Sequence, residues 1–362
     1  MSRRWLAKLS TSVQIRPLAP LSSCSMMSDF AIGRGDSLRV AVVGMGKMGI
    51  VHSSVLHVIP GVEVVGLCEK SRLIRRFLKK VFTDVEIVDD VEKLTGMGLN
   101  AVYVTTPIPS HYPITKAIYA KNVAQNVFVE KTLANNYDES IELCGLASRC
   151  GGVNMVGYLR RFYVTFKKAK EMLAQGALGE LSSFSVHALS SDFLGMKEED
   201  SASSMRGGVL RDLGCHALDL ALWYFGDLKV EPANVNSVSP CSAKGMLEFQ
   251  GSSSAGLTGD FRISWCQEGY RMPEVGVTIV GSEGKLQVND DLVRFGPKRG
   301  HESIWYRHDL SDNVPFWLGL PEYYREDLHF VETVKSGAKI EPDFVSASKV
   351  DRMIAEVERL GD

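Results

Sequence analysis

The sequence predicts a parallel α/β half followed by an α+β half whose sheet is mainly antiparallel. Up to about residue 159, short apolar runs alternate with helical stretches, a pattern typical of right-handed βαβ units. From 230 to 310, short strand-like runs follow one another across Gly, Ser and Asn turns, as in linked hairpins. The 362 residues are enough for two domains with a core each.

In the first half, apolar and β-branched runs predict strands buried on both faces, at 38–44, 62–69, 100–107, 126–131 and 153–159. The stretches between them predict helices over 50–59, 111–122 and 138–150. Because the strands are expected to be parallel, their carboxyl ends meet at one edge of the sheet, where ligands of such sheets bind.

The second half begins with a predicted helix over 163–175 and a strand over 179–189. A Ser- and acid-rich loop (190–206) and an apolar helix beginning at 207 follow. After the strand-rich segment, the periodicity predicts two helices, over 322–335 and 344–359.

We place the domain limits at 37–155 for the first domain and 156–362 for the second, with 1–36 as a flexible extension or leader. The first 28 residues carry Arg, Lys, Ser and Thr but no acid. A disordered tail, an organellar transit peptide, or a true start at Met26 or Met27 would each fit. A twin-arginine export signal is disfavoured, because no apolar stretch follows Arg3 and Arg4.

Composition excludes several classes of protein. With 45% hydrophobic and 23% charged residues and a net charge of −2, the chain has no basic footprint for nucleic acid or a membrane surface. No apolar run is long enough to span a bilayer. The seven cysteines are scattered, odd in number and without a C-x-x-C pair, which disfavours disulfides and a metal site. We expect a cytoplasmic protein.

The segment "GMGKMG" predicts a dinucleotide site. It matches G-x-G-x-x-G, follows a strand and opens a helix. Gly44 makes the tight turn, Gly46 lets the backbone approach the pyrophosphate, and Gly49 lets helix and strand pack closely. The pyrophosphate would rest on the helix N-terminus, where free N–H groups favour anions. The loop residues between the glycines, Met45, Lys47 and Met48, are expected to line this site.

Glu69, at the end of the next strand, favours NAD over NADP. A carboxylate about 20 residues beyond the glycines accepts from the ribose 2′-OH. Lys70, Ser71 and Arg72 follow directly and leave NADP open, because they could hold a 2′-phosphate.

Two further strand ends supply polar groups to the same crevice. Thr106 and Pro107 end one strand and His111 begins the helix beyond it; Glu130 and Lys131 end the next. We expect all five residues at the cofactor, with Lys131 near the nicotinamide and the substrate.

The helix beginning at 207 is apolar nearly all round yet carries Asp212, His216 and Asp219. Asp212 and His216 are four residues apart, so they lie on one side of a helix. Hydride transfer at a carbinol carbon needs a partner for the hydroxyl proton, and a carboxylate beside a histidine fixes the tautomer of its ring. This favours Lys131, Asp212 and His216 as catalytic and substrate-binding residues. Asp219 is better explained as a buried carboxylate paired with an arginine.

Motifs along nearly the whole chain, from about 37 to 355, resemble one known family. They are "GMGKMGIVH" (44–52), "TTPIPSH" (105–111), "FVEKTLA" (128–134), "GYLRRF" (157–162), "GALGEL" (176–181), "GGVLRDLGCHALDLALWYFG" (207–226) and "GSEGKLQV" (281–288). In this order they are similar to the glucose–fructose oxidoreductase / inositol dehydrogenase / MocA (Gfo/Idh/MocA) family.

The resemblance implies a Rossmann domain, a domain with a large mainly antiparallel sheet, and a homodimer or homotetramer formed through the open face of that sheet. It implies NAD(P)-dependent oxidation or reduction of a sugar, cyclitol or sugar-nucleotide hydroxyl, with the family's Lys–Asp–His set at Lys131, Asp212 and His216. Tyr158 and Arg161 would lie near the substrate. The family usually has Glu-Lys-Pro where this chain has Thr132, which removes a conformational restriction on the lysine backbone.

Two other functions stay open on the sequence. One is a dinucleotide-binding sensor without turnover, which the intact Lys–Asp–His set disfavours. The other is a reductase of a non-sugar substrate on the same fold.

Overall fold

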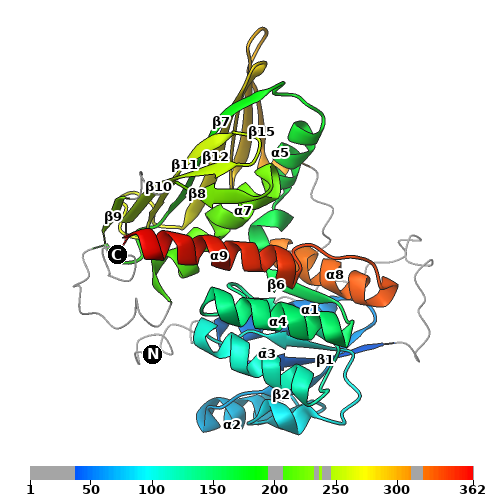
Figure 1. Ribbon diagram of the computed structural model, residues 1–362. Helices are drawn as coiled ribbons and strands as arrows, with labels where there is room; N and C mark the ends of the chain where they lie inside the picture. The colour runs from blue at the N-terminus through cyan, green and yellow to red at the C-terminus, as the bar shows by residue number, and fades with distance from the viewer. Residues whose placement is uncertain (1–36, 195–206, 232–235, 239–245, 311–320, 362) are drawn as a thin grey trace, which may run out of the picture. The chain divides into compact units, whose positions relative to one another are not determined.

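The computed structural model describes residues 37–194, 207–231, 236–238, 246–310 and 321–361. The elements from Leu38 onward belong to one compact unit and build two β-sheets (Figure 1). The expected extension 1–36 and most of the loop expected over 190–206 lie outside the described residues.

The first sheet has six parallel strands in the spatial order β3-β2-β1-β4-β5-β6. They are β1 (Leu38–Val43), β2 (Val62–Cys68), β3 (Glu86–Val88), β4 (Ala101–Val104), β5 (Asn126–Glu130) and β6 (Asn154–Gly157). This is the order of a doubly wound nucleotide-binding sheet, which reverses direction between β1 and β4. The expected α/β class is confirmed.

Helices cover both faces of this sheet, as its continuous apolar strands predict. They are α1 (Lys47–Val58), α2 (Arg72–Val81), α3 (His111–Ala120) and α4 (Tyr137–Cys150), with 3₁₀ turns η2 (Val91–Leu94), η3 (Ile108–Ser110) and η4 (Leu159–Phe162). Val40 and Val42 of β1 belong to the core shared with α1, whereas Ala41 and Val43 belong to the core shared with α3 and α4. The alternation is that of a strand with two buried faces.

The second sheet has nine strands, eight of them in the order β15-β14-β13-β12-β7-β11-β10-β8, with β9 paired to β10. Its strands are β7 (Leu181–Leu189), β8 (Leu228–Val230), β9 (Asn236–Val238), β10 (Met246–Ser253), β11 (Thr258–Ser264), β12 (Glu274–Gly281), β13 (Gly284–Asn289), β14 (Leu292–Pro297) and β15 (Ser303–Tyr306). All pairs are antiparallel except β7 with β11. The mainly antiparallel expectation is therefore confirmed.

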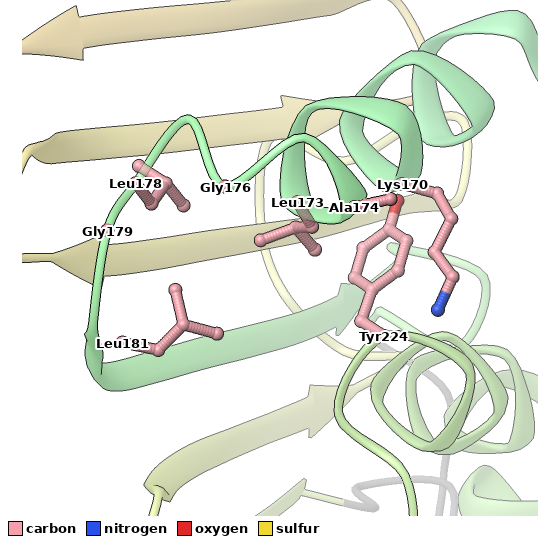
Figure 2. Close-up of a pocket in the computed structure, with 8 residues that line it drawn as sticks. All are labelled: Lys170, Leu173, Ala174, Gly176, Leu178, Gly179, Leu181 and Tyr224. Carbon is pink, nitrogen blue, oxygen red and sulfur yellow. The ribbon is translucent and has the colours of Figure 1, made fainter.

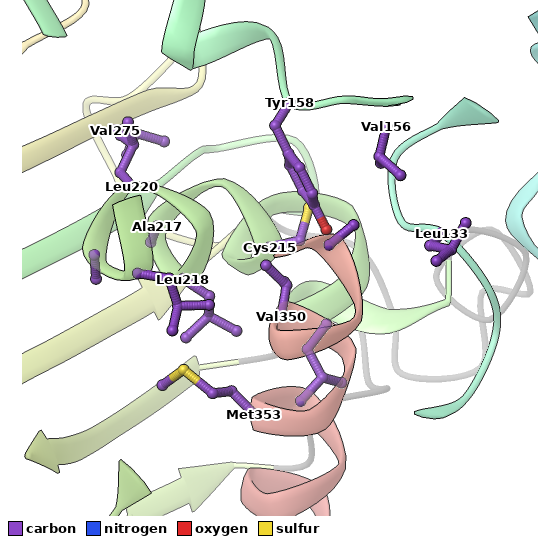
Figure 3. Packing of buried hydrophobic residues seen from close by; sticks show 14 of the residues in the cluster. Leu133, Val156, Tyr158, Cys215, Ala217, Leu218, Leu220, Val275, Val350 and Met353 are labelled. Atoms are coloured by element: carbon purple, nitrogen blue, oxygen red, sulfur yellow. The ribbon is translucent and has the colours of Figure 1, made fainter. Parts of the chain in front are cut away.

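Helices α5 (Val164–Ala174) and α7 (Cys215–Phe225) pack on this sheet. Figure 3 shows Cys215 and Leu218 of α7 in one apolar core with Val350 and Met353 of the last helix, α9 (Phe344–Gly361). α7 is shorter than the single helix expected from 207, because Leu210–Gly214 forms a π-helical turn instead. Such turns are rare and are frequently found at functional sites.

The last helices return to the first sheet. α8 (Pro321–Ser336) packs against α1 and η4, and α9 (Phe344–Gly361) packs against both α4 and α7 (Figure 1). A 3₁₀ turn, η7 (Arg307–Asp309), follows β15.

Two elements, α2 and β3, were not expected from the sequence. In α2 only Leu78 is buried, while Leu73 and Phe77 are 77% and 63% exposed. Leu73, Ile74, Phe77, Leu78 and Val81 recur at helical spacing, so the signal for this helix is present in the sequence, although most of the stripe is not buried.

Candidate functional site

The glycine loop joins β1 to α1 in the conformation that a dinucleotide site needs. Gly44 has a φ of +95°, in the region that favours glycine. A Cβ on Gly49 would lie 1.9 Å from the carbonyl oxygen of Gly44, so only glycine fits there. A Cβ on Gly46 would meet nothing within 4 Å, and no side chain caps α1 at this residue. The open space and the free N–H groups of α1 fit a pyrophosphate.

Glu69 is fixed beside this loop. Its carboxylate accepts hydrogen bonds from the backbone N–H of Met45 at 2.9 Å and of Ser71 at 2.7 Å. Arg75 donates to the carbonyl oxygens of Glu69 and Lys70. A carboxylate held at this strand end fits the ribose hydroxyls of NAD and repels a 2′-phosphate.

His111 lies behind the crevice rather than in it. The ring is fully buried, with Nδ1 2.7 Å from the carbonyl oxygen of Thr132 and Nε2 2.7 Å from that of Thr106. Burial lowers the pKa of His111, although the two carbonyls oppose this effect. The expected direct contact with the cofactor does not fit this placement, because both ring nitrogens are engaged with the backbone of the two strand-end loops.

Lys131 extends from the end of β5 to the π-helical turn. Its Nζ donates to the carbonyl oxygen of Asp212 at 2.6 Å and to Asp212 Oδ1 at 3.0 Å. The two side chains are 19% and 25% exposed, so the pair is open to a ligand on one side. Burial disfavours the ammonium, but Asp212 and the neighbouring anionic groups outweigh it and raise the pKa of Lys131. The Lys131–Thr132 peptide is cis.

His216 is the second residue of α7, just after that turn, and its Nδ1 is buried with no hydrogen-bond partner among the described residues. Burial, with the positive charges of Arg160 and Lys131, lowers the pKa of His216 well below its ordinary value. The ring is therefore neutral near pH 7. The expected pairing of Asp212 with His216 is replaced by the Lys131–Asp212 pair, so Asp212 serves the lysine and leaves the imidazole with a vacant nitrogen.

The predicted substrate contacts of Tyr158 and Arg161 do not fit the structure. Tyr158 is fully buried in the apolar core, where Figure 3 shows its ring approaching Cys215. Arg161 is 6% exposed and donates from Nε and Nη2 to Asp219. The alternative explanation of Asp219, a buried carboxylate paired with an arginine, is confirmed. Arg160 is likewise paired, with Asp290.

Sequence reasoning missed a second cluster, which we call the His52 cluster: His52 of α1, Glu130 of β5 and Asp327 of α8. His52 Nδ1 lies 2.8 Å from Asp327 Oδ1, and Nε2 lies 3.0 Å from Glu130 Oε1. Glu130 was expected at the cofactor; its carboxylate instead binds His52 and the backbone N–H of Lys131. A histidine inside the buried face of α1 was the available signal, but nothing local marks Asp327.

The cavity that Figure 2 shows lies elsewhere. It measures about 330 Å³ and is lined by residues from the end of α5, the start of β7 and Tyr224 of α7. None of the predicted site residues lines it. The described residues contain no group of three His, Cys, Asp or Glu side chains arranged to hold a metal ion. Within the same ranges, none of the helices has the length and apolar character of a bilayer span.

Comparisons with known proteins agree with this architecture. Residues 38–158 match the family model "Oxidoreductase family, NAD-binding Rossmann fold", and residues 166–287 match "GFO/IDH/MocA C-terminal domain". The fold is similar to that of levoglucosan dehydrogenase solved with NADH and levoglucosan, with a TM-score of 0.77 over 90% of this chain and 97% of the other, at 18% identity.

Curated relatives also match in sequence, among them dehydrogenases named for a glucoside and for an inositol. D-glucoside 3-dehydrogenase of Escherichia coli is 27% identical over 55% of this chain, and scyllo-inositol 2-dehydrogenase (NAD(+)) of Bacillus subtilis is 25% identical over 83%. The matches cover 57% of the first protein and 87% of the second, so the chain spans little more than half of the first.

Proposed function

The chain belongs to the Gfo/Idh/MocA family of oxidoreductases with an NAD-binding Rossmann fold, and on that premise we propose that it is a dehydrogenase of a sugar or cyclitol. The reaction would move a hydride between NAD(H) and the carbon of a secondary hydroxyl. The observation that carries the proposal is the Lys131–Asp212 pair at the end of β5, together with the unpartnered Nδ1 of His216, four residues after Asp212.

The proposed roles follow from the charges. Lys131, an ammonium, donates to the substrate oxygen and stabilises negative charge there. Asp212 holds that ammonium in place. His216, a neutral imidazole, accepts the hydroxyl proton at Nδ1 in the oxidative direction and returns it in the reductive one. NAD, when bound, supplies the hydride acceptor. Since Lys131 already carries its proton, we assign the base to His216.

The proposed cofactor contacts are residues of the glycine loop and of the strand ends beside it: Gly44, Met45, Gly46, Lys47, Met48, Gly49, Glu69, Thr106 and Pro107. Tyr158, Arg161 and His111 are left out, because each is buried, and Arg161 and His111 are engaged by other groups. Relatives named for glucosides and inositols support a substrate with several ring hydroxyls.

The proposal also covers the oligomeric state of the protein and its location in the cell. We propose a homodimer or homotetramer formed through the sheet face away from α5 and α7, in a cytoplasmic protein. That face carries exposed Thr258, Asp260 and Arg262 of β11, so an interface there would be polar. Light scattering coupled to gel filtration tests the assembly; a monomer at micromolar concentration would contradict it.

The test of the reaction is turnover. The full chain is mixed with NAD⁺ or NADP⁺ and a panel of sugars, inositols and UDP-sugars, and absorbance is followed at the reduced-nicotinamide band. We expect reduction with NAD⁺ and one substrate class, lost in Lys131→Ala and His216→Ala but kept in the exposed control Lys121→Ala. Tight NAD binding without turnover across the panel would favour the sensor, and activity that survives Lys131→Ala would overturn the assigned roles.

A further inference from the structure

The His52 cluster lies directly behind the lysine of the proposed site. His52 and Asp327 have no exposed side-chain surface, and Glu130 has 10%. The rings of Tyr103, Phe128 and Tyr323 surround the imidazole at centroid distances of 5.1–5.7 Å. The three polar groups are therefore screened from water and interact with one another.

The geometry favours a positively charged His52. Both ring nitrogens face carboxylate oxygens, and a neutral imidazole would turn a lone pair toward one of them. An imidazolium donates to both. Burial works against the cation, but Asp327 and Glu130 outweigh it and raise the pKa of His52 well above its ordinary value. The pKa of Glu130 is lowered despite burial, because His52 and Lys131 stabilise its charge.

The Glu130 carboxylate connects His52 to Lys131. Its Oε1 accepts from His52, and its Oε2 accepts from the backbone N–H of Lys131 at 3.0 Å. The same negative charge favours the Lys131 ammonium. On the other side, His111 holds the carbonyl of Thr132. Hydrogen bonds to the Lys131 N–H and to the Thr132 carbonyl thus hold the backbone on both sides of the lysine.

We propose that His52 is a positioning residue: its imidazolium, anchored by Asp327, keeps the Glu130 carboxylate charged and oriented behind Lys131. His52 touches no substrate in this scheme. The inference rests on the proposed function of Lys131, but its structural part can be tested without turnover.

Several charged or titratable groups surround His52 and Lys131. Those facing His52 are Asp327, Glu130, Tyr103, Tyr323 and the nearby Glu326; those facing Lys131 are Asp212, Cys215, Glu130, His111 and His216. Burial and the neighbouring Glu130 carboxylate raise the pKa of Glu326 well above its ordinary value, so it stays neutral. Among these groups, His52 is the cation that stabilises the charge of Glu130 from the side away from Lys131.

Loss of the His52 charge therefore has a defined consequence. Glu130, buried without its cation, takes up a proton, and Lys131 loses a neighbouring negative charge. The pKa of Lys131 then falls, by about one unit for an opposite charge at this range.

The direct test is a titration of Lys131 in the full chain without NAD. Lysines are reductively methylated with ¹³C, the Lys131 signal is assigned by its absence in Lys131→Arg, and its pKa is measured by NMR. We expect the pKa to fall by about one unit in His52→Gln and in Asp327→Asn. His57→Gln, an exposed histidine on the same helix, should leave it unchanged. An unchanged Lys131 pKa in a folded His52→Gln would overturn the proposal.

A second readout is the pH–rate profile. If the wild type turns over, the alkaline limb that reports Lys131 should move to lower pH in Asp327→Asn, with kcat lowered and KM for the substrate kept. If the wild type turns nothing over, the reaction proposal fails while the titration still decides the role of His52. If neither variant folds, the cluster is purely structural and the positioning role is wrong.

Discussion

The His52 cluster and the Lys131 site (Lys131, Asp212 and His216) use the same residue types in opposite ways. In the His52 cluster both ring nitrogens meet carboxylates, and the imidazole is fully buried. In the Lys131 site the carboxylate binds the lysine, and a ring nitrogen of His216 is left without a partner. A buried polar atom without a partner costs about 1–3 kcal/mol, which a ligand can return. His52 therefore supports the fold through both ring nitrogens, whereas Nδ1 of His216 is available to a ligand.

The largest expected effect comes from removing the charge of the Lys131 site. Lys131→Met should lower kcat/KM about 10³-fold, because the substrate oxygen loses its only assigned cation. The measurement is initial rate on the substrate found by the panel, with Lys121→Met as control. Residual activity above a tenth of the wild type would show that the ammonium is dispensable.

The two histidines should separate in a paired experiment. His216→Leu should lower turnover about 10²-fold and leave the thermal midpoint unchanged or higher, because it removes an unsatisfied nitrogen. His52→Leu should lower the midpoint by about 5 °C or more, since it leaves Glu130 and Asp327 buried without their cation. Thermal unfolding and rate are measured on both. An equal fall of the thermal midpoint in the two variants would contradict the proposed difference between His216 and His52.

Asp351 extends the comparison to a buried carboxyl whose direct partner is a hydroxyl, that of Ser140. Burial raises its pKa to about 7. The folded protein therefore holds this proton more tightly than the unfolded chain, and the free energy of unfolding falls as pH rises from about 4 to about 7.

In Asp351→Asn this fall should shrink, by an amount on the order of 2 kcal/mol. The check is the thermal midpoint of both proteins at pH 5 and pH 8. A wild type that gains stability relative to the variant as pH rises would refute the assignment.

The smallest expected effects come from adding a Cβ at Gly46 or at Gly49 of the glycine loop. Gly46→Ala should fold normally, because its Cβ meets nothing, and should bind NADH about tenfold more weakly. Gly49→Ala should instead lower the thermal midpoint without cofactor, since its Cβ overlaps the Gly44 carbonyl. Fluorescence titration and thermal unfolding distinguish them; normal NADH affinity in Gly46→Ala would move the pyrophosphate away from this loop.

Local patterns predicted most of the first sheet. The strand ends, the glycine loop, Glu69 and Lys131 could be found because each depends on a few consecutive residues. α2 could have been predicted, because Leu73, Ile74, Phe77, Leu78 and Val81 recur at helical spacing. The π-helical turn at Leu210–Gly214 escaped because a helical period cannot show where a hydrogen bond skips one residue further.

The sequence did not reveal which side chains from distant segments pair with one another. Spacing on one helix suggested that Asp212 serves His216, but a lysine from β5 takes the carboxylate. The resemblance implied that Arg161 lies near the substrate, and the sequence predicted an arginine partner for Asp219 without showing that Arg161 is that partner. Ion pairs between distant segments depend on tertiary packing, which periodicity does not report.

The return of α8 to α1 also sets an order of events during synthesis. The hydrogen bond from His52 to Asp327 joins residues 275 positions apart. At the usual 5–20 residues per second, a ribosome needs on the order of tens of seconds between them. Throughout that interval His52 lacks one of its two carboxylate partners and the side of α1 that packs on α8 is uncovered, so the nucleotide-binding half is completed only after α8 emerges.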